Sequence, residues 1–369
     1  MKYFFDQHYL CGAKKFHNIY QAFEEQKKTQ EFPQYMLDAE LVDALKHIKR
    51  PKNLTPKYIR ALMVKRLKQI RQDTGKLKLL FTGGTDSNTI LRLCMENSIY
   101  LDEVATHMVS IKQCPKTNIE YLPGIKYAMQ YQDKLIGKIN LINPTIQDME
   151  DQVASLEWFL DTDWQRGCDI HLRPFSYPRI IRNDLQMDED TIVLTGYEKP
   201  KLLIEDGHAF WTHDDRGLAE TSGIENTIPF FLDKGNPELV CAMSYAFLES
   251  VNMDKFKNGM LVFSRIKERT LKEKIINNLG LYPTGRHYID FHLLGKDKYN
   301  NSIKSRRFLK EIVQSGKPHL VDRLWQTHEI IYNRYKDLPY ALEKKTSKMI
   351  QTVGRYAQKI PILQDKFAS

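Results

Sequence analysis

The chain has 369 residues, of which 42% are hydrophobic and 27% are charged, and these values are typical of globular proteins. Its length favours two or three packed units over a single core. The chain has no run of about 18 apolar residues, so we expect no membrane span. The N-terminus lacks the apolar region of a signal peptide. The five scattered cysteines form no C-x-x-C pair, which argues against a disulfide framework or a zinc site. We therefore expect a cytoplasmic protein without membrane attachment.

The charge of the chain favours an anionic partner. Lysine and arginine outnumber aspartate and glutamate by 55 to 46, which gives a formal net charge of +9. A nucleotide, a nucleic acid or another phosphate compound would suit such an excess, and charge alone does not choose among them.

Residues 1–75 are predicted to be mostly helical. Thr55 and Pro56 provide an N-cap and a first helical residue, and Thr74 and Gly75 end the helix. The face opposite the apolar residues of this helix is basic. It carries Lys57, Arg60, Lys65, Arg66, Lys68 and Arg71.

The next block alternates strand and helix patterns. Strands are predicted over 77–81, 104–111, 138–142 and 191–195, and helices over 88–95, 119–131 and 146–160. Such alternation predicts a parallel sheet, whose ligands bind beyond the carboxyl ends of its strands. The glycine-containing strand ends at 82–87 and 195–199 should therefore open on the same edge.

Residues from about 201 onward are predicted to be helical again. The helix-type periodicity covers 237–251, 261–279, 305–315 and 340–358.

A glycine-rich turn follows the first strand of the block. Its residues are Thr82, Gly83, Gly84, Thr85, Asp86 and Ser87. The two glycines allow backbone N–H groups to approach phosphate oxygens, and the following helix points its positive end at the same anion. Asp86 would repel a bare phosphate, which suggests Mg²⁺ between the carboxylate and the phosphates. A tight turn with Asp86 as a helix cap is the structural alternative.

This turn resembles the phosphate-binding loop of the PP-loop, or N-type, ATP pyrophosphatases, whose signature is S-G-G-x-D-S. Thr82 stands in place of the first serine and keeps its hydroxyl. The resemblance implies an α/β fold with a parallel-sheet PP-loop domain (HUP-like, adenine nucleotide alpha hydrolase-like) and ATP with Mg²⁺ at the turn. Neither a Walker A loop nor the dinucleotide G-x-G-x-x-G pattern fits these residues.

Within this family the order of elements is most similar to the synthetase domain of asparagine synthetases and β-lactam synthetases. The similar stretches are 174–179, 193–198 and 228–233 with the helix that follows. The resemblance covers about residues 77–280. It implies an N-terminal helical region (1–75), an ATP-binding α/β domain (76–200) and a mainly helical region (201–369) that completes the active site.

The chain departs from these synthetases in its second acidic loop. The family has an Asp-Glu pair where this chain has Glu198 followed by Lys199. The resemblance assigns Mg²⁺ to Asp86 and Glu198 and phosphate contact to Lys199, with a solvated turn as the alternative. Arg265 and Lys267 are the candidates for the late catalytic lysine of the family, and Lys267 is the preferred one, with a solvated basic helix face as the alternative.

Two further positions complete the predicted site. Ser110, near the end of the second strand, is the expected adenine contact, and Gly196 lies at the end of the fourth strand. The glutaminase that precedes asparagine synthetases has a cysteine at position two, where this chain has Lys2. We therefore expect a free amine, ammonia or a partner's product as the nucleophile.

The resemblance predicts an ATP-dependent ligase that adenylates a substrate oxygen and forms a carbon–nitrogen bond, releasing AMP and pyrophosphate. A first alternative is a PP-loop enzyme that modifies tRNA, DNA or a nucleobase, for which the basic helix would provide a contact surface. A second alternative is a degenerate nucleotide-binding module used for assembly. The acceptor is a small molecule or a nucleic acid, and the sequence leaves a homo-oligomer open.

Overall fold

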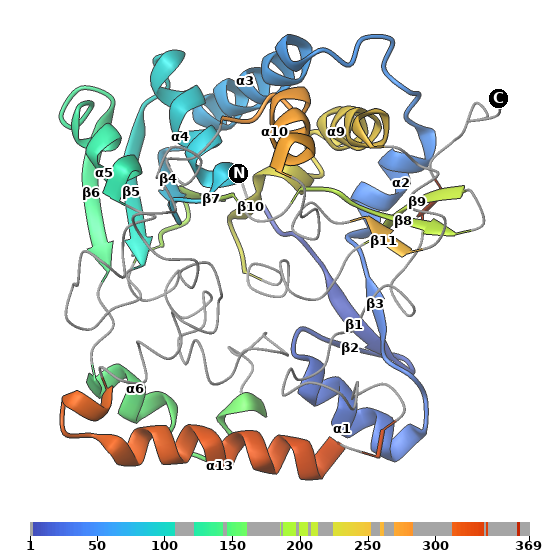
Figure 1. Ribbon diagram of the computed structural model, residues 1–369, viewed down its shortest axis with the longest axis vertical. Helices are drawn as coiled ribbons and strands as arrows, with labels where there is room; N and C mark the ends of the chain where they lie inside the picture. The colour runs from blue at the N-terminus through green and yellow to red at the C-terminus, as the bar shows by residue number, and fades with distance from the viewer. Residues whose placement is uncertain are drawn as a thin grey trace.

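The three-dimensional description rests on a computed structural model of the chain (Figure 1). It describes residues 3–107, 122–142, 146–160, 185, 187–196, 199–205, 208–212, 224–251, 259–261, 269–282, 312–335, 337–338 and 360–361.

A parallel five-stranded sheet forms the centre of the molecule. Its strands are β4 (Lys76–Leu80), β5 (Leu101–His107), β6 (Ile136–Ile142), β7 (Thr191–Thr195) and β10 (Thr227–Pro229). They lie in the order β10-β7-β4-β5-β6, and all their pairings are parallel. The chain moves outward from β4 to β5 and β6, and then returns to the other side of β4 to add β7 and β10. The strand order therefore reverses between β4 and β7, which is where open α/β sheets bind ligands.

The predicted alternation of strands and helices is confirmed, with shifted boundaries. The second strand begins at Leu101, before the predicted position 104. The helix predicted over 119–131 is α5 (Leu122–Met129). The segment predicted as one helix over 146–160 divides into α6 (Ile146–Gln152) and the short η1 (Trp158–Leu160).

Four helices form a layer that packs together above the sheet in Figure 1. They are α3 (Pro56–Asp73), α4 (Thr85–Glu96), α9 (Pro237–Ser250) and α10 (Arg269–Asn278). The predicted cap of α3 is confirmed, because Thr55 accepts a hydrogen bond from the Tyr58 N–H and Pro56 is the first helical residue. Leu77 and Leu79 of β4 belong to the large apolar core that includes these helices.

The opposite face of the sheet has its own apolar cluster. Leu80 and Val193 pack there with Leu185 and Ile224. Successive side chains of a strand point to opposite faces, so Leu80 lies on the other side of β4 from Leu79. Burial on both faces explains why the three central residues of β7 are all apolar, whereas β4 contains Lys78, which is buried and pairs with Glu103 at 3.0 Å.

The flanking regions are predicted to be mostly helical, and the structure adds a small antiparallel sheet to each of them. Within residues 1–75, the helices α1 (Ile19–Thr29) and α2 (Ala39–His47) accompany a small antiparallel sheet. Its strands are β1 (His8–Cys11), β2 (Lys14–Phe16) and β3 (Gln34–Met36). Beyond residue 200 a second antiparallel sheet precedes and joins the helices. Its strands are β8 (Lys201–Glu205), β9 (His208–Thr212), β11 (Gly259–Leu261) and β12 (Ile360–Pro361). Each of these strands has five residues or fewer. Such short strands were not recognised in a sequence analysis based on helical periodicity.

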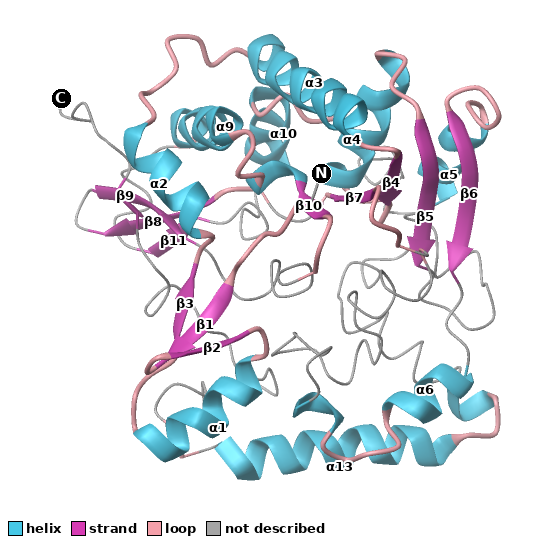
Figure 2. Ribbon diagram, turned by 180° about the vertical axis from the view of Figure 1, so that it is seen from behind, coloured by secondary structure: helices cyan, strands magenta, loops and turns pink. Residues whose placement is uncertain are grey.

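A second helical layer lies below the carboxyl ends of β5 and β6, as both views show (Figures 1 and 2). It combines α1, α6 and η1 with α13 (Pro318–Tyr335), a helix that the sequence did not predict. The Tyr20 ring lies 5.2 Å from the Phe159 ring and 5.7 Å from that of Tyr335. The Trp158 indole donates to the Thr327 hydroxyl at 3.2 Å. Aromatic packing thus joins early, middle and late parts of the chain. The helix predicted over 340–358 lies outside the described residues, as do residues 305–311 of the helix predicted over 305–315.

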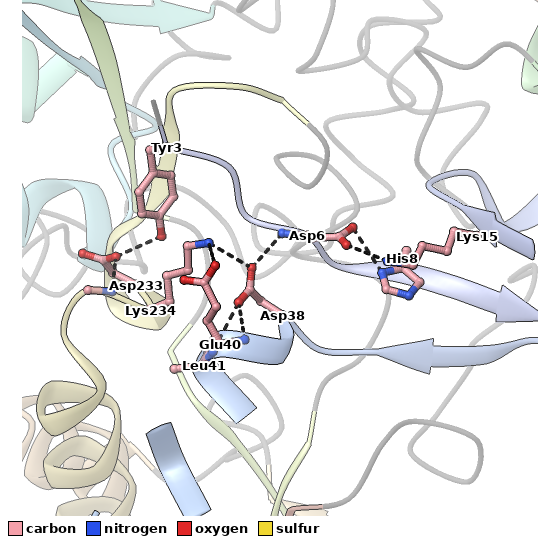
Figure 3. Close-up of polar contacts among 10 residues, drawn as sticks. Tyr3, Asp6, His8, Lys15, Asp38, Glu40, Leu41, Asp233 and Lys234 are labelled. Atoms are coloured by element: carbon pink, nitrogen blue, oxygen red, sulfur yellow. Dashed lines mark hydrogen bonds and ion pairs between the residues drawn. The ribbon is translucent and has the colours of Figure 1, made fainter. Parts of the chain in front are cut away.

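The N-terminal segment is fastened to the segment between β10 and α9 (Figure 3). The Tyr3 hydroxyl donates to Asp233 at 2.9 Å, and the buried Arg66 of α3 donates to the same carboxylate at 2.6 Å. Lys234 lies 3.6 Å from Asp38, the residue that caps α2. Since Asp233 is fully buried, these contacts supply the positive and polar partners that a buried carboxylate needs.

Candidate functional site

The glycine-rich turn lies at the reversal of strand order. It connects the carboxyl end of β4 to α4, and the parallel register places Thr195, the last residue of β7, opposite Leu80. The segment after β7 therefore begins beside the turn. The structure brings the two predicted glycine-containing strand ends together on one edge of the sheet.

The turn is shaped as an open anion cradle. Gly83 has φ +70°, a left-handed conformation that favours glycine. Gly84 is the N-cap residue of α4, which begins at Thr85, and no side chain accepts a capping hydrogen bond at this position. The first N–H groups of a helix have no partner within the helix, and at this end they carry partial positive charge. A Cβ on Gly84 would meet just one neighbouring atom within 4 Å among the described residues, the Thr82 hydroxyl oxygen at 3.5 Å. The turn therefore leaves room above its backbone.

The hydroxyls of Thr82 and Ser87 bond to each other across the base of the turn. Thr82 Oγ1 and Ser87 Oγ lie 3.2 Å apart, and Ser87 Oγ also accepts from the Thr82 N–H at 3.2 Å. Ser87 is buried and Thr82 is half-buried. The Thr82 hydroxyl is therefore the more accessible of the two for a ligand.

Gly196 fixes the distance between the turn and the end of β7. A Cβ at this position would lie 2.4 Å from the Ser87 nitrogen and 2.8 Å from its Cα. Contacts this short with backbone atoms cannot be relieved by a side-chain rotation. Glycine at 196 therefore allows the two loops to touch.

A salt bridge crosses the same gap. Lys199 Nζ lies 2.5 Å from Asp86 Oδ1, and both side chains are largely buried. Asp86 lies in the first turn of α4 and Gly84 is the cap, so the reading of Asp86 as a helix cap is wrong. The pair puts a carboxylate and an ammonium group at the mouth of the cradle.

A second lysine, which the sequence reasoning missed, lies near Lys199. Burial, together with the positive charge of Lys199, lowers the pKa of Lys272 on α10. Lys272 shares a helix face with Ile276 and Leu279, which are both buried. A lysine on an apolar face was the sequence signal that could have identified it.

The position of α10 relative to the turn is fixed through Thr89. Its buried hydroxyl donates to the Thr85 carbonyl at 2.7 Å and accepts from the Tyr282 N–H, four residues beyond α10, at 2.9 Å. The Arg60 guanidinium lies 4.4 Å above the Tyr282 ring and donates to the Gly280 carbonyl. The Thr89 hydroxyl therefore connects the segment that follows α10 to Thr85, the first residue of α4.

The described residues supply one carboxylate to a metal at this site. No group of three or more His, Cys, Asp or Glu side chains that could hold a metal occurs in the described part of the chain. Mg²⁺ is commonly bound by one or two carboxylates together with substrate phosphates. Asp86 fits a metal that arrives with phosphates, and it does not form a metal cage by itself.

Three predicted site residues lie outside the described residues. They are Ser110, Glu198 and Lys267.

The basic helix α3 differs from its prediction. Arg66 is buried against Asp233, Arg60 faces Tyr282, and Arg71 binds Asp102 at 2.7 Å. These arginines bind the protein itself, and the lysines of the helix are exposed.

No helix within the described ranges is long and apolar enough to cross a membrane. No protein-family model, curated protein or solved structure matches the chain. The interpretation of the site therefore rests on the residues of the chain itself.

Proposed function

We propose that the protein is an ATP-dependent adenylating enzyme of the PP-loop type, which converts ATP to AMP and pyrophosphate and forms an amide. The observation that carries the proposal is the open Gly83-Gly84 turn at the reversal of strand order, with Lys199 bound to Asp86 of the turn and Lys272 within electrostatic range of Lys199. A helix N-terminus, an unobstructed backbone and two ammonium groups suit a polyphosphate.

The residues have separable tasks in this reaction. The turn and the start of α4 hold the phosphates, and Lys199 and Lys272 neutralise the charge that develops on the departing pyrophosphate. A substrate oxygen attacks the α-phosphorus, and the bond from that phosphorus to the bridging oxygen breaks, so that pyrophosphate leaves with the electron pair. A nitrogen nucleophile then attacks the activated carbon, loses a proton and displaces AMP.

Mg²⁺ accompanies ATP in this proposal and would be held by Asp86 together with the phosphates. The ion would lower the negative charge of the triphosphate. Asp86 binds Lys199 in the structure, so the carboxylate that would hold the metal is shared with an ammonium group that could contact the phosphates.

The elements after β10 support the amide-forming branch. β10 leads into the short helix η3 (Phe230–Leu232), then Asp233, and then α9. A strand, a short turn ending in aspartate and a long helix are what the resemblance to asparagine and β-lactam synthetases implies for this stretch. The acceptor and the amine follow from this resemblance alone.

The test is product analysis with labelled ATP. Purified protein is incubated with ATP, Mg²⁺ and pooled metabolites, and AMP and pyrophosphate are measured. We expect both products in equal amounts from the wild type and none from Asp86→Asn, which should fold normally. ADP as the product would overturn adenylation. Tight ATP binding with no turnover in any pool would instead support the assembly module.

A further inference from the structure

The positive charge of the chain is concentrated in one stretch. Residues 43–73 contain ten lysines and arginines against two aspartates, which gives +8 of the chain's total of +9. The remainder of the chain is therefore almost neutral. Such a concentration of positive charge is typical of a surface that binds an anionic partner.

The structure separates this charge into an internal part and an external part. Arg60, Arg66 and Arg71 contact the protein itself, and Arg50 pairs with Glu249 across the surface. Six lysines remain exposed. They are Lys46, Lys49, Lys52, Lys57, Lys65 and Lys68, which we call the lysine ridge. Among the described residues, no carboxylate forms an ion pair with any of them.

The ridge runs from the end of α2 through the connection into α3. Three of its lysines come from the end of α2 and the connection to α3, which crosses the upper side of the molecule in Figures 1 and 2. The other three share the outward face of α3, because spacings of eight and three residues return to the same side of a helix. Lys57 and Lys68 are separated by about 16 Å along the helix axis. This length covers several phosphates of a nucleic acid strand.

The ridge suits a phosphodiester backbone better than a lipid surface. The apolar face of α3 is buried in the core through Ile59 and Leu67, so it has no side chains to insert into a bilayer. Among the described residues, the large exposed hydrophobics all lie outside residues 43–73. Lysine is a flexible point charge that contacts phosphate without reading sequence.

We propose that the lysine ridge binds the backbone of a nucleic acid, without sequence specificity. The proposal rests on the charge and exposure of residues 43–73 and does not depend on the proposed adenylation. If both hold, they favour the alternative in which the enzyme modifies tRNA or DNA.

The test measures binding of the full chain to fluorescein-labelled oligouridylate by fluorescence anisotropy, between about 50 and 200 mM salt. The wild type should show affinity that falls steeply with salt. In Lys57→Gln/Lys65→Gln/Lys68→Gln the slope of log K against log salt should become shallower by about 2, and affinity at about 0.1 M salt should drop about a hundredfold. Single Lys65→Gln should make the slope shallower by about 0.7.

The matched control is Lys126→Gln/Lys134→Gln/Lys138→Gln, which removes the same charge from exposed positions elsewhere. It should bind like the wild type. Equal losses in both triple variants would reduce the effect to net charge and overturn the proposal, as would undetectable binding by the wild type. Binding to phosphatidylserine vesicles but not to RNA would overturn it in favour of a membrane. The triple variant of the ridge should still bind labelled ATP. Its loss of nucleic acid binding can then be distinguished from damage to the proposed adenylation site.

Discussion

Lys199 and Asp86 join two loops that belong to adjacent parallel strands, with 2.5 Å between Nζ and Oδ1. Their contact lies directly beside Gly196, whose missing side chain lets the same two loops touch through the backbone. The salt bridge and the close backbone approach at Gly196 therefore determine the same distance, that between the two loops. The geometry of the cradle depends on β7 as much as on the turn itself.

Two glycine variants should separate the shape of the cradle from its stability. Gly196→Ala should lower the free energy of unfolding by about 1–3 kcal/mol, because the new methyl group overlaps backbone atoms of the turn. It should also weaken ATP binding. Gly84→Ala has room for its methyl group, so it should fold with wild-type stability and still lose ATP binding. Urea unfolding and titration with labelled ATP measure the two effects. Normal ATP affinity in Gly84→Ala would remove this turn from the phosphate site.

The Thr89 hydroxyl should couple α10 to the turn. Thr89→Val keeps the shape but leaves the Tyr282 N–H without its acceptor, so we expect a loss of about 1–3 kcal/mol in stability. Thr89→Ser keeps the hydroxyl and is the control. If α10 positions Lys272, the valine variant should also reduce kcat more than it raises KM for ATP. Equal behaviour of the valine and serine variants would show that the hydroxyl has no such role.

Lys272 should give the stability a characteristic pH dependence. Burial and the charge of Lys199 lower its pKa below the ordinary 10.5. Between the lowered pKa and 10.5, the unfolded chain binds more protons than the folded one, so the free energy of unfolding should rise with pH. Lys272→Met should lack this rise. Lys199→Met removes the second cause and should shrink it. Urea unfolding of the three proteins from neutral pH to about 10 tests this, and parallel curves would contradict it.

The buried pair of Arg66 and Asp233 should be strongly coupled. Arg66→Met leaves a buried carboxylate without its cation, and Asp233→Asn leaves a buried guanidinium without its anion. Each change should cost about 3–5 kcal/mol, and the double variant should cost less than their sum. A thermodynamic cycle from chemical denaturation measures the coupling. Strictly additive losses would mean that Tyr3 and the neighbouring backbone, rather than Arg66, stabilise Asp233.

The parallel sheet and its glycine turn were predictable because their signals are local. An apolar strand buried on both faces, a turn of small residues and an amphipathic helix each leave a pattern within a dozen residues. The α3 cap at Thr55 is equally local. Asp206 and Gly207 were also a readable hairpin signal between β8 and β9, which the helical interpretation of that region overlooked.

The partners of the charged residues were not predictable. Arg66 and Lys68 look alike in the sequence, but one meets Asp233, 167 residues away, and the other faces solvent. The pKa of Lys272 is likewise lowered by burial and by Lys199, which lies far away in the sequence. Such pairings depend on which segments cross in three dimensions, and periodicity contains no information about that crossing.

One apolar core contains residues from Tyr3 near the N-terminus to Tyr335 in α13, and it includes residues on both faces of α9. Residues 76–200, cut out as a nucleotide-binding piece, would lose α3 and α9 and expose Leu77 and Leu79 to water. Such a piece would aggregate rather than bind ATP. The shape of the glycine turn therefore depends on the whole core, and a destabilising change as distant as α13 should affect it.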